Sequence, residues 1–256
     1  MPGLFYVDTH CHLEQEEFDQ DRDLVVMKAK ELGIAIITSG IEESLWEKAC
    51  SIAESYPNVY ASIGLDPTQF GICDKALQWI KSNSNRIIAI GETGLDHYLV
   101  RDHKDRDRQK LCFKKMIGLA DSLKVPIQVH SRSAGKKALG ALSENSARDV
   151  HLHAFDGKAS LARTASRDLG YYFSIPTSVA RSPQKRRLVK AIHIERLLIE
   201  TDSPLLGAEK GVRNVPANIP IALKEVASIL GREEEEIREV VLENTLRLYT
   251  NIQMNS

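Results

Sequence analysis

The chain has 256 residues, of which 43% are hydrophobic and 27% charged, and its formal net charge at pH 7 is −1. A chain of this kind can bury a substantial core, and single α/β barrels commonly run to about 250 residues. The balanced charge argues against wholesale electrostatic binding of nucleic acid, although it leaves room for a local site.

The cysteines and the N-terminus favour a cytoplasmic protein. Four scattered cysteines, Cys11, Cys50, Cys73 and Cys112, include no Cys-x-x-Cys pair, so we expect reduced thiols. No apolar run approaches the roughly 18 residues of a membrane span, and no signal-peptide pattern opens the chain. Because no Gly/Ser-rich linker appears either, we expect one domain over residues 1–256.

Short apolar runs alternate with segments of helical pattern along the whole chain. Eight runs suit strands of a parallel sheet: Leu4–Val7, Ile34–Thr38, Val59–Leu65, Ile87–Ile90, Ile127–Val129, Val150–Leu152, Tyr171–Ile175 and Leu197–Ile199. Eight β/α alternations in about 250 residues predict a (β/α)8 TIM barrel. A doubly wound open sheet is the alternative, but no G-x-G-x-x-G loop follows the first run.

The helical pattern is clearest in four segments. Apolar residues open a helix at Leu24–Ala29, and Ile41–Ser55 forms the next one. Apolar residues recur at helical spacing in Gln109–Leu123. The tail, Gly231–Thr250, begins with the acidic run Glu233–Glu236, which suits the positive end of a helix dipole.

Ionisable residues follow the runs at the positions where a barrel carries its active site. Catalytic groups of a parallel barrel lie at the C-terminal ends of the strands. The side chains at these ends include His10, His12, Glu92, His130, His153 and Asp202, with Asp66 after the third run. Each alone has an ordinary interpretation as a cap, a turn residue or a hydrogen-bonded histidine. Their joint position indicates a metal site.

The size of the ligand set favours two ions. Six ligands are too many for one catalytic zinc, which usually takes three protein groups and keeps one position open. Two ions roughly 3.5–4 Å apart can share a carboxylate, hold a bridging hydroxide as nucleophile and clamp a phosphoryl oxygen. Imidazole and carboxylate ligands suit zinc, manganese or iron(II), whereas a site dominated by oxygen would suit magnesium better.

Five segments carry these ligands in order along the chain, and two more follow them: Val7–Leu13, Ala89–Asp96, Pro126–Arg132, His153–Gly157, Glu200–Pro204, then Arg213–Pro216 and Glu243–Thr245. Together they resemble the TatD-type metal-dependent deoxyribonucleases over essentially the whole chain. The resemblance implies an amidohydrolase-like TIM barrel that hydrolyses DNA phosphodiester bonds with two divalent ions, of zinc, magnesium or manganese.

The resemblance also implies a role for each ligand. His10, His12 and Asp202 would hold one ion, Glu92 would bridge to the second, and His130 and His153 would complete that second site. Asp202 and Glu92 are then the catalytic candidates, and Asp202 is placed to orient or deprotonate the attacking hydroxide.

Two positions depart from the family pattern. Asp66 stands where the family usually has a histidine near the bound phosphate, and a carboxylate would repel phosphate. Asp66 would be either a further site residue or a residue that stabilises the turn before Pro67. Asp156, where the family often has a small hydroxyl residue, adds a second carboxylate near the barrel mouth.

Phosphate recognition calls for basic side chains near the metals. Arg132, two residues past His130, is the strongest candidate, and Arg101, Arg213 and His97 are weaker ones. Tyr98 could stack on an unpaired base. We expect the run Arg101–Arg108 to be a solvated loop that enters a helix, and Lys185-Arg186-Arg187 to lie on a helix and face solvent.

These features support one leading hypothesis and one alternative. The leading hypothesis is a two-metal deoxyribonuclease that acts as an exonuclease, because a barrel mouth admits a single-stranded or frayed end more readily than a duplex. The alternative is an amidohydrolase-type amide or ester hydrolase acting on a small metabolite or aminoacyl-RNA. Glu92 stands where many amidohydrolases carry a carboxylated lysine, and this favours the nuclease. Asp66 and the lack of an excess of basic residues favour the alternative.

Overall fold

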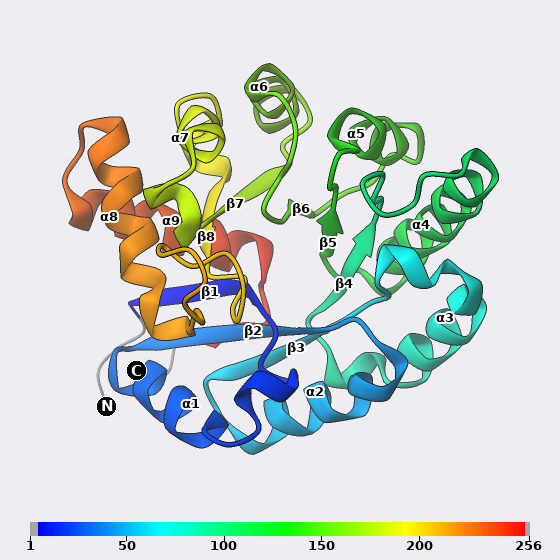
Figure 1. The fold of residues 1–256 in the computed structure, drawn as a ribbon, viewed down its shortest axis with the longest axis horizontal. Coiled ribbons are helices and arrows are strands. Elements are labelled where there is room, and N and C mark those ends of the chain that lie inside the picture. The colour runs from blue at the N-terminus through cyan, green and yellow to red at the C-terminus, as the bar shows by residue number, and fades with distance from the viewer. Residues whose placement is uncertain (1–4, 254–256) are drawn as a thin grey trace.

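The eight predicted strands form one parallel sheet that curves into a barrel with helices outside it (Figure 1). The structure is a computed structural model and describes residues 5–253. The strands pair in chain order from the first to the eighth. The two outer strands meet where the Thr9 hydroxyl donates to Ile199 O (2.8 Å) and the Asp202 amide donates to His10 O (2.9 Å). The predicted TIM barrel is therefore confirmed.

Each strand coincides with one predicted apolar run, although Leu4, where the first run begins, lies outside the described residues. The strands are β1 (Tyr6–Cys11), β2 (Ile34–Gly40), β3 (Val59–Ile63), β4 (Ala89–Gly94), β5 (Ile127–His130), β6 (Val150–Leu152), β7 (Tyr172–Pro176) and β8 (Leu197–Glu200). β1, β4 and β5 extend past the ends of their apolar runs, so that His10, Glu92 and His130 lie in the strands themselves.

Helices follow the strands and pack on the outer face of the sheet. Their bounds are α1 (Arg22–Glu31), α2 (Glu43–Ser55), α3 (Cys73–Ser82), α4 (His103–Leu123), α5 (Gly135–Glu144), α6 (Ala159–Asp168), α7 (Pro183–Val189), α8 (Ile219–Leu230) and α9 (Glu234–Leu248). None of them combines the length and apolar character needed to cross a membrane, as judged over residues 5–253.

The expected loop at Arg101–Arg108 is mostly helical, so that prediction was wrong. The Asp102 carboxylate accepts hydrogen bonds from Lys104 N (2.8 Å) and Asp105 N (3.2 Å), and it caps α4 so that the helix begins at His103. An aspartate before a helix start satisfies amides that have no partner within the helix.

Buried apolar side chains form one cluster on each face of the sheet. Inside the barrel, Val7, Ala35 and Leu198 pack with Tyr249 and Ile252 from the tail beyond α9. The larger cluster lies between the sheet and the helices. Apolar residues near the strand starts thus fill the N-terminal end of the barrel, and the polar residues gather at the opposite end.

In β1 and β4, the alternation of inward and outward side chains is interrupted just before a predicted ligand. Val7 lies in the interior cluster but Cys11 lies in the outer one, although residues four apart in a regular strand share a face. The pairing of β1 with β2 shifts between Asp8 and Cys11, and the pairing of β4 with β5 shifts between Ile90 and Thr93. Such irregularities re-aim side chains, and here they affect the segments that carry His10 and Glu92.

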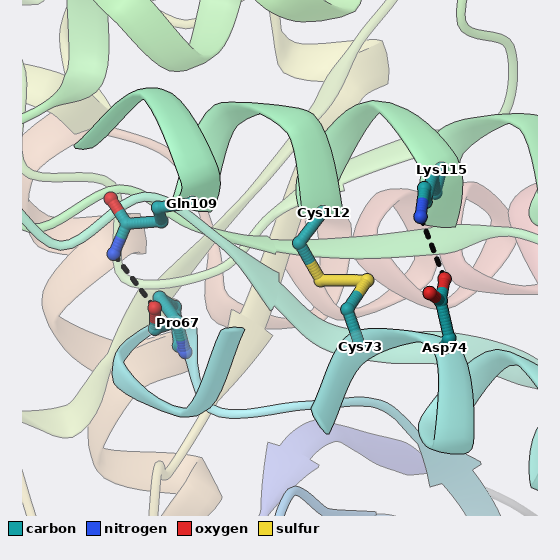
Figure 2. Close-up of a disulfide and its surroundings, with 6 residues drawn as sticks. All are labelled: Pro67, Cys73, Asp74, Gln109, Cys112 and Lys115. Carbon is teal, nitrogen blue, oxygen red and sulfur yellow. Dashed lines mark hydrogen bonds and ion pairs between the residues drawn. A yellow bond between two sulfur atoms is a disulfide. The ribbon is translucent and has the colours of Figure 1, made fainter. Parts of the chain in front are cut away.

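A disulfide joins Cys73, the first residue of α3, to Cys112 in α4 (Figure 2). The expectation that all four cysteines are reduced was therefore wrong, and only Cys11 and Cys50 are free thiols. On either side of the disulfide, the Gln109 amide donates to Pro67 O (2.8 Å) and Lys115 pairs with Asp74 (2.6 Å). These contacts fasten the segment after β3 to α4.

Candidate metal centre

The six predicted ligands converge at the C-terminal mouth of the barrel. His10 Nε2 lies 3.0 Å from Glu92 Oε2 and 3.7 Å from Asp202 Oδ1. His12 Nε2 lies 3.5 Å from Asp202 Oδ1, and His153 Nε2 lies 3.4 Å from Glu92 Oε2. Residues from three strands and from the segments that follow β1, β6 and β8 therefore point their donor atoms into one small space.

The donor atoms form two overlapping groups that share His10. One group is His10, His12 and Asp202, and the other is His10, Glu92 and His153; in each, the donor atoms lie within 4.8 Å of one another. His130 stands at the edge of the second group, with Nδ1 2.5 Å from Glu92 Oε1 and Nε2 3.2 Å from Asp96 Oδ2. This arrangement provides two overlapping groups of potential metal ligands, with His130 beside Glu92.

Hydrogen-bond acceptors at Nδ1 fix the ring orientations of His10 and His12. His12 Nδ1 lies 2.9 Å from Ser39 O and 3.2 Å from Glu14 Oε1, while Nε2 faces the acidic side chains. His10 Nδ1 lies 2.9 Å from Gln128 Oε1. A carbonyl or amide oxygen at Nδ1 holds the proton there and leaves Nε2 free to act as a ligand.

Ion pairing outweighs burial in setting the protonation of the cluster. Burial raises the pKa of Glu92, but His153, His130 and His10 outweigh it and hold that pKa well below its usual value. Burial lowers the pKa of His130, yet Glu92 and Asp96 raise it to about 9. A divalent ion would take the place of these protons, since metal binding requires neutral imidazole.

The residues present fit a metal site. Two buried ring nitrogens, His10 Nε2 and His130 Nδ1, lie beside Glu92 oxygens, but neither makes a hydrogen bond of good geometry within residues 5–253. Buried polar atoms without partners are rare unless an ion, a water or a function accounts for them. Imidazole nitrogens beside carboxylate oxygens are donors that zinc, manganese and iron(II) accept.

A chain of buried polar side chains behind the ligands was not predicted from the sequence. The Gln128 amide donates to the Tyr249 hydroxyl (2.9 Å), which lies 2.6 Å from His151 Nδ1. His151 Nε2 lies 2.6 Å from the Ser174 hydroxyl, which donates to Glu200 (2.5 Å). Glu200 in turn lies 3.6 Å from His153 Nδ1, so the chain runs from behind His10 to behind His153.

Arg132 and its neighbours stand at the rim of the site. The exposed Arg132 guanidinium lies 4.0 Å from the centre of the Tyr98 ring, which is also exposed. His97 is half-buried and donates its amide to Arg132 O (2.9 Å), and Arg101 Nε donates to Tyr98 O over 3.4 Å. The three predicted contacts after β4 and β5 thus gather on one side of the mouth.

The other two predicted substrate contacts are engaged in local structure. The Asp66 carboxylate accepts from Thr68 N (2.7 Å) and from the Thr68 hydroxyl, which gives it the turn-stabilising role. Arg213 pairs with Asp21 and lies over the Phe18 ring, with its guanidinium carbon 5.0 Å from the ring centre. Within residues 5–253 neither belongs to a group of potential metal ligands.

Lys185 does not face solvent, so that part of the prediction for Lys185-Arg186-Arg187 was wrong. Its buried ammonium donates to Ala154 O (2.6 Å) and Phe155 O (2.9 Å), and the Ala154 amide donates to Glu200 (2.8 Å). Lys185 therefore holds the backbone that directly follows His153. Three consecutive helical residues point in three directions, so one of them can face inward.

The fold and the clustered ligands define a TIM-barrel hydrolase of the metal-dependent kind. The family model described as "TatD related DNase" matches residues 7–250, and the chain belongs to that family. Human "Deoxyribonuclease TATDN3" is 39% identical, with 98% of this chain and 96% of that protein covered. The metal-dependent hydrolase MJ1582 of Methanocaldococcus jannaschii is 34% identical, with 97% of this chain and 98% of that protein covered.

A solved structure agrees with this assignment. The structure of YJJV, a TatD homolog from Escherichia coli, superimposes with a TM-score of 0.86 at 25% identity, with 96% of this chain and 98% of that chain covered. The family predicted from the sequence segments is thereby confirmed.

Proposed function

We propose that this protein hydrolyses DNA phosphodiester bonds with two divalent ions held by His10, His12, Glu92, His130, His153 and Asp202. The observation that carries the proposal is that Glu92 Oε2 lies 3.0 Å from His10 Nε2, 3.8 Å from His12 Nε2 and 3.4 Å from His153 Nε2, so that one carboxylate adjoins both groups of donors. Family membership supplies the reaction class, and the naming of human TATDN3 as a deoxyribonuclease favours DNA over other esters.

Each side chain has a defined task in this proposal. When bound, the ions supply positive charge that acidifies water and neutralises phosphoryl oxygens. Asp202 orients the attacking water and accepts its proton, because its carboxylate oxygen lies 3.7 Å from His10 Nε2 and 3.5 Å from His12 Nε2, within the group of donors that would hold one ion. Arg132 offers a planar donor fork to the phosphate, and Tyr98 offers a face to the adjoining base.

The substrate in this proposal is a single-stranded or frayed DNA end. The ligands are buried at the mouth of a barrel, so an unpaired terminus reaches them more easily than the middle of a duplex does. The capping role of Asp66 removes the main reason to favour an amide or ester substrate, because the carboxylate is engaged by Thr68.

Domain organisation and location complete the proposal. We treat residues 1–256 as one domain, since all eight strands belong to a single sheet. We retain a cytoplasmic location. The Cys73–Cys112 disulfide counts against it, because disulfides are rare in reducing compartments. Cell fractionation tests the location, and thiol labelling of Cys73 and Cys112 tests whether the disulfide forms there.

Asp202→Asn tests the mechanism. Asparagine keeps the shape and tolerates the left-handed backbone of this position, where φ is 53°. We expect hydrolysis of single-stranded DNA to fall at least about a hundredfold, because the proton acceptor is lost. Asp149→Asn is the matched control, since Asp149 also has a positive φ, 49°, but precedes β6 at the opposite end of the barrel.

A substrate panel separates the two reaction classes. The metal-loaded protein is assayed on single-stranded DNA, duplex DNA, RNA and simple amides. Activity on amides with none on phosphodiesters would overturn the proposal, as would undiminished DNA hydrolysis by Asp202→Asn. Asp66→His is expected to leave phosphodiesterase activity equal or higher, because the replaced carboxylate stabilises a turn rather than binding phosphate.

A further inference from the structure

A pocket of about 800 Å³ lies beside the candidate metal centre. It is formed by the segment after β5, the segment after β6 and the start of α7, and the helices α5, α6 and α7 stand next to one another there (Figure 1). Ser133 in its lining is three residues past His130, and Asp156 is three residues past His153. Three residues span at most about 11 Å, so the pocket edge is close to the ligands.

Four basic side chains line this pocket without a partner. Lys136, Lys137, Lys158 and Arg187 are all exposed, and none makes an ion pair or side-chain hydrogen bond with any residue of 5–253. The contrast within α7 is sharp: Arg186 pairs with Glu225 (2.5 Å) and Lys185 donates to two carbonyls, whereas Arg187 is free. In a chain of net charge −1, four unpaired cations around one pocket form a local positive site.

The backbone around the pocket adds to its positive potential. The residues before α5 and α6, Ala134 and Lys158, line the pocket, and neither provides a side-chain cap. The first two amides of each helix are therefore left for another acceptor, whereas Leu161 N donates to Lys158 O (3.0 Å), and both helix dipoles place positive charge there. An anion in the pocket would accept hydrogen bonds from the helix amides and pair with the exposed Lys and Arg side chains.

One carboxylate also lines the pocket. Asp156 Oδ2 accepts a hydrogen bond from Ser133 N (3.0 Å), so it ties the segment after β6 to the segment after β5. Its negative charge repels an anion. Removing this charge should therefore raise the affinity for an anion, whereas removing the basic side chains should lower it.

We infer that this basic pocket binds a backbone phosphate of the same DNA strand whose scissile phosphate lies at the metal centre. The inference rests on the proposed deoxyribonuclease function. The pocket lies along the rim, so a strand that enters the mouth passes it within a few nucleotides. It explains how a nearly neutral protein holds a polyanion: the affinity comes from a local site that grips the strand away from the reacting bond.

Charge removal tests the pocket. The variant with Lys136→Gln, Lys158→Gln and Arg187→Gln is compared with a triple variant of equal charge change, Lys30→Gln, Lys81→Gln and Lys124→Gln, whose exposed lysines lie at helix C-terminal ends, away from the mouth of the barrel. The probe is a fluorescent single-stranded phosphorothioate oligonucleotide, which resists hydrolysis, and binding is read by anisotropy.

The pocket variant should bind this probe at least about tenfold more weakly than the control triple variant, since charged contacts are lost. The slope of log affinity against log salt should become shallower by about 0.7 for each phosphate no longer held. Asp156→Asn should bind more tightly than the unaltered protein. Equal affinity and equal salt slope in the pocket and control variants would overturn the inference.

Two substrates separate this inference from the proposed function. In the pocket variant, kcat/KM should fall about tenfold further for a single-stranded oligonucleotide than for bis(p-nitrophenyl) phosphate, which has no flanking phosphate. If the unaltered protein hydrolyses neither substrate but still binds the probe through the pocket, the proposed function fails and the pocket stands. If it hydrolyses both and the pocket variant loses equally on both, the pocket inference fails alone.

Discussion

The Asp8 carboxylate accepts hydrogen bonds from the amide and the hydroxyl of Thr201, over 2.7 and 2.5 Å, and joins β1 to the segment that follows β8. Both residues are fully buried. Close by, Asp202 N donates to His10 O and His12 N donates to Ser203 O. The place where the barrel closes is therefore also the place that brings His10 and His12 against Asp202.

Asp8→Ala should destabilise the protein and loosen the metal centre. Two buried donors of Thr201 would lose their acceptor, so we expect the free energy of unfolding to fall by about 2–4 kcal/mol in urea titrations. Asp168→Ala, an exposed acid at the end of α6, should change it by less than about 0.5 kcal/mol. A loss no larger than that of the control would show that Asp8 does not hold the barrel closed.

Tyr249→Phe should weaken metal binding while the fold is kept. The variant removes one hydroxyl that links Gln128 to His151 behind the ligands. Loss of such outer support typically costs about tenfold or more in metal affinity. Tyr172→Phe is the control, because Tyr172 lies in the same interior cluster and its hydroxyl has no hydrogen bond within residues 5–253. Calorimetric titration with Zn²⁺ or Mn²⁺ measures both, and equal affinities would remove the supporting role.

The metal-free protein should show a basic His130. Its pKa is raised to about 9 by Glu92 and Asp96 against the effect of burial. A raised pKa stabilises the folded state fully below about pH 6.5, and this contribution is lost as the pH rises through about 9. NMR titration of the ring in the presence of chelator measures the pKa, and Asp96→Asn should lower it. A pKa near 6.5 in both proteins would contradict the ion pairs.

Reduction of the disulfide should cost stability more than function. Cys73 and Cys112 are separated by 39 residues, and closing a loop of that length stabilises a fold by about 2–4 kcal/mol. We expect the Cys73→Ser/Cys112→Ser variant to unfold at lower urea concentration and to bind metal with unchanged affinity. A metal affinity that fell with the disulfide would instead connect α3 and α4 to the site.

The barrel and the clustering of the six proposed ligands were predictable because both depend on local sequence patterns. Parallel strands buried on both faces read as apolar runs, and a proposed ligand such as Glu92 or His130 lies within two residues of the end of its run. Side chains at the same end of neighbouring parallel strands must meet, so position alone was enough to assemble the set. The ordered segments then identified the family.

The supports of the site were not predictable because they depend on the folded geometry. Tyr249 comes from the tail, and no local pattern shows that it reaches Gln128 and His151 inside the barrel. The disulfide joins two helices whose cysteines have no characteristic spacing. Asp66 and Lys185 could each point to the site or to a backbone partner, and only the packing decides which.

The central claim is that two ions lie side by side with Glu92 between them. The most direct test is anomalous diffraction from crystals soaked with Mn²⁺ or Zn²⁺. The account predicts two peaks about 3.5–4 Å apart at the barrel mouth, one beside His12 and Asp202 and one beside His130 and His153, with Glu92 touching both. A single peak, or two peaks that do not share Glu92, would contradict it.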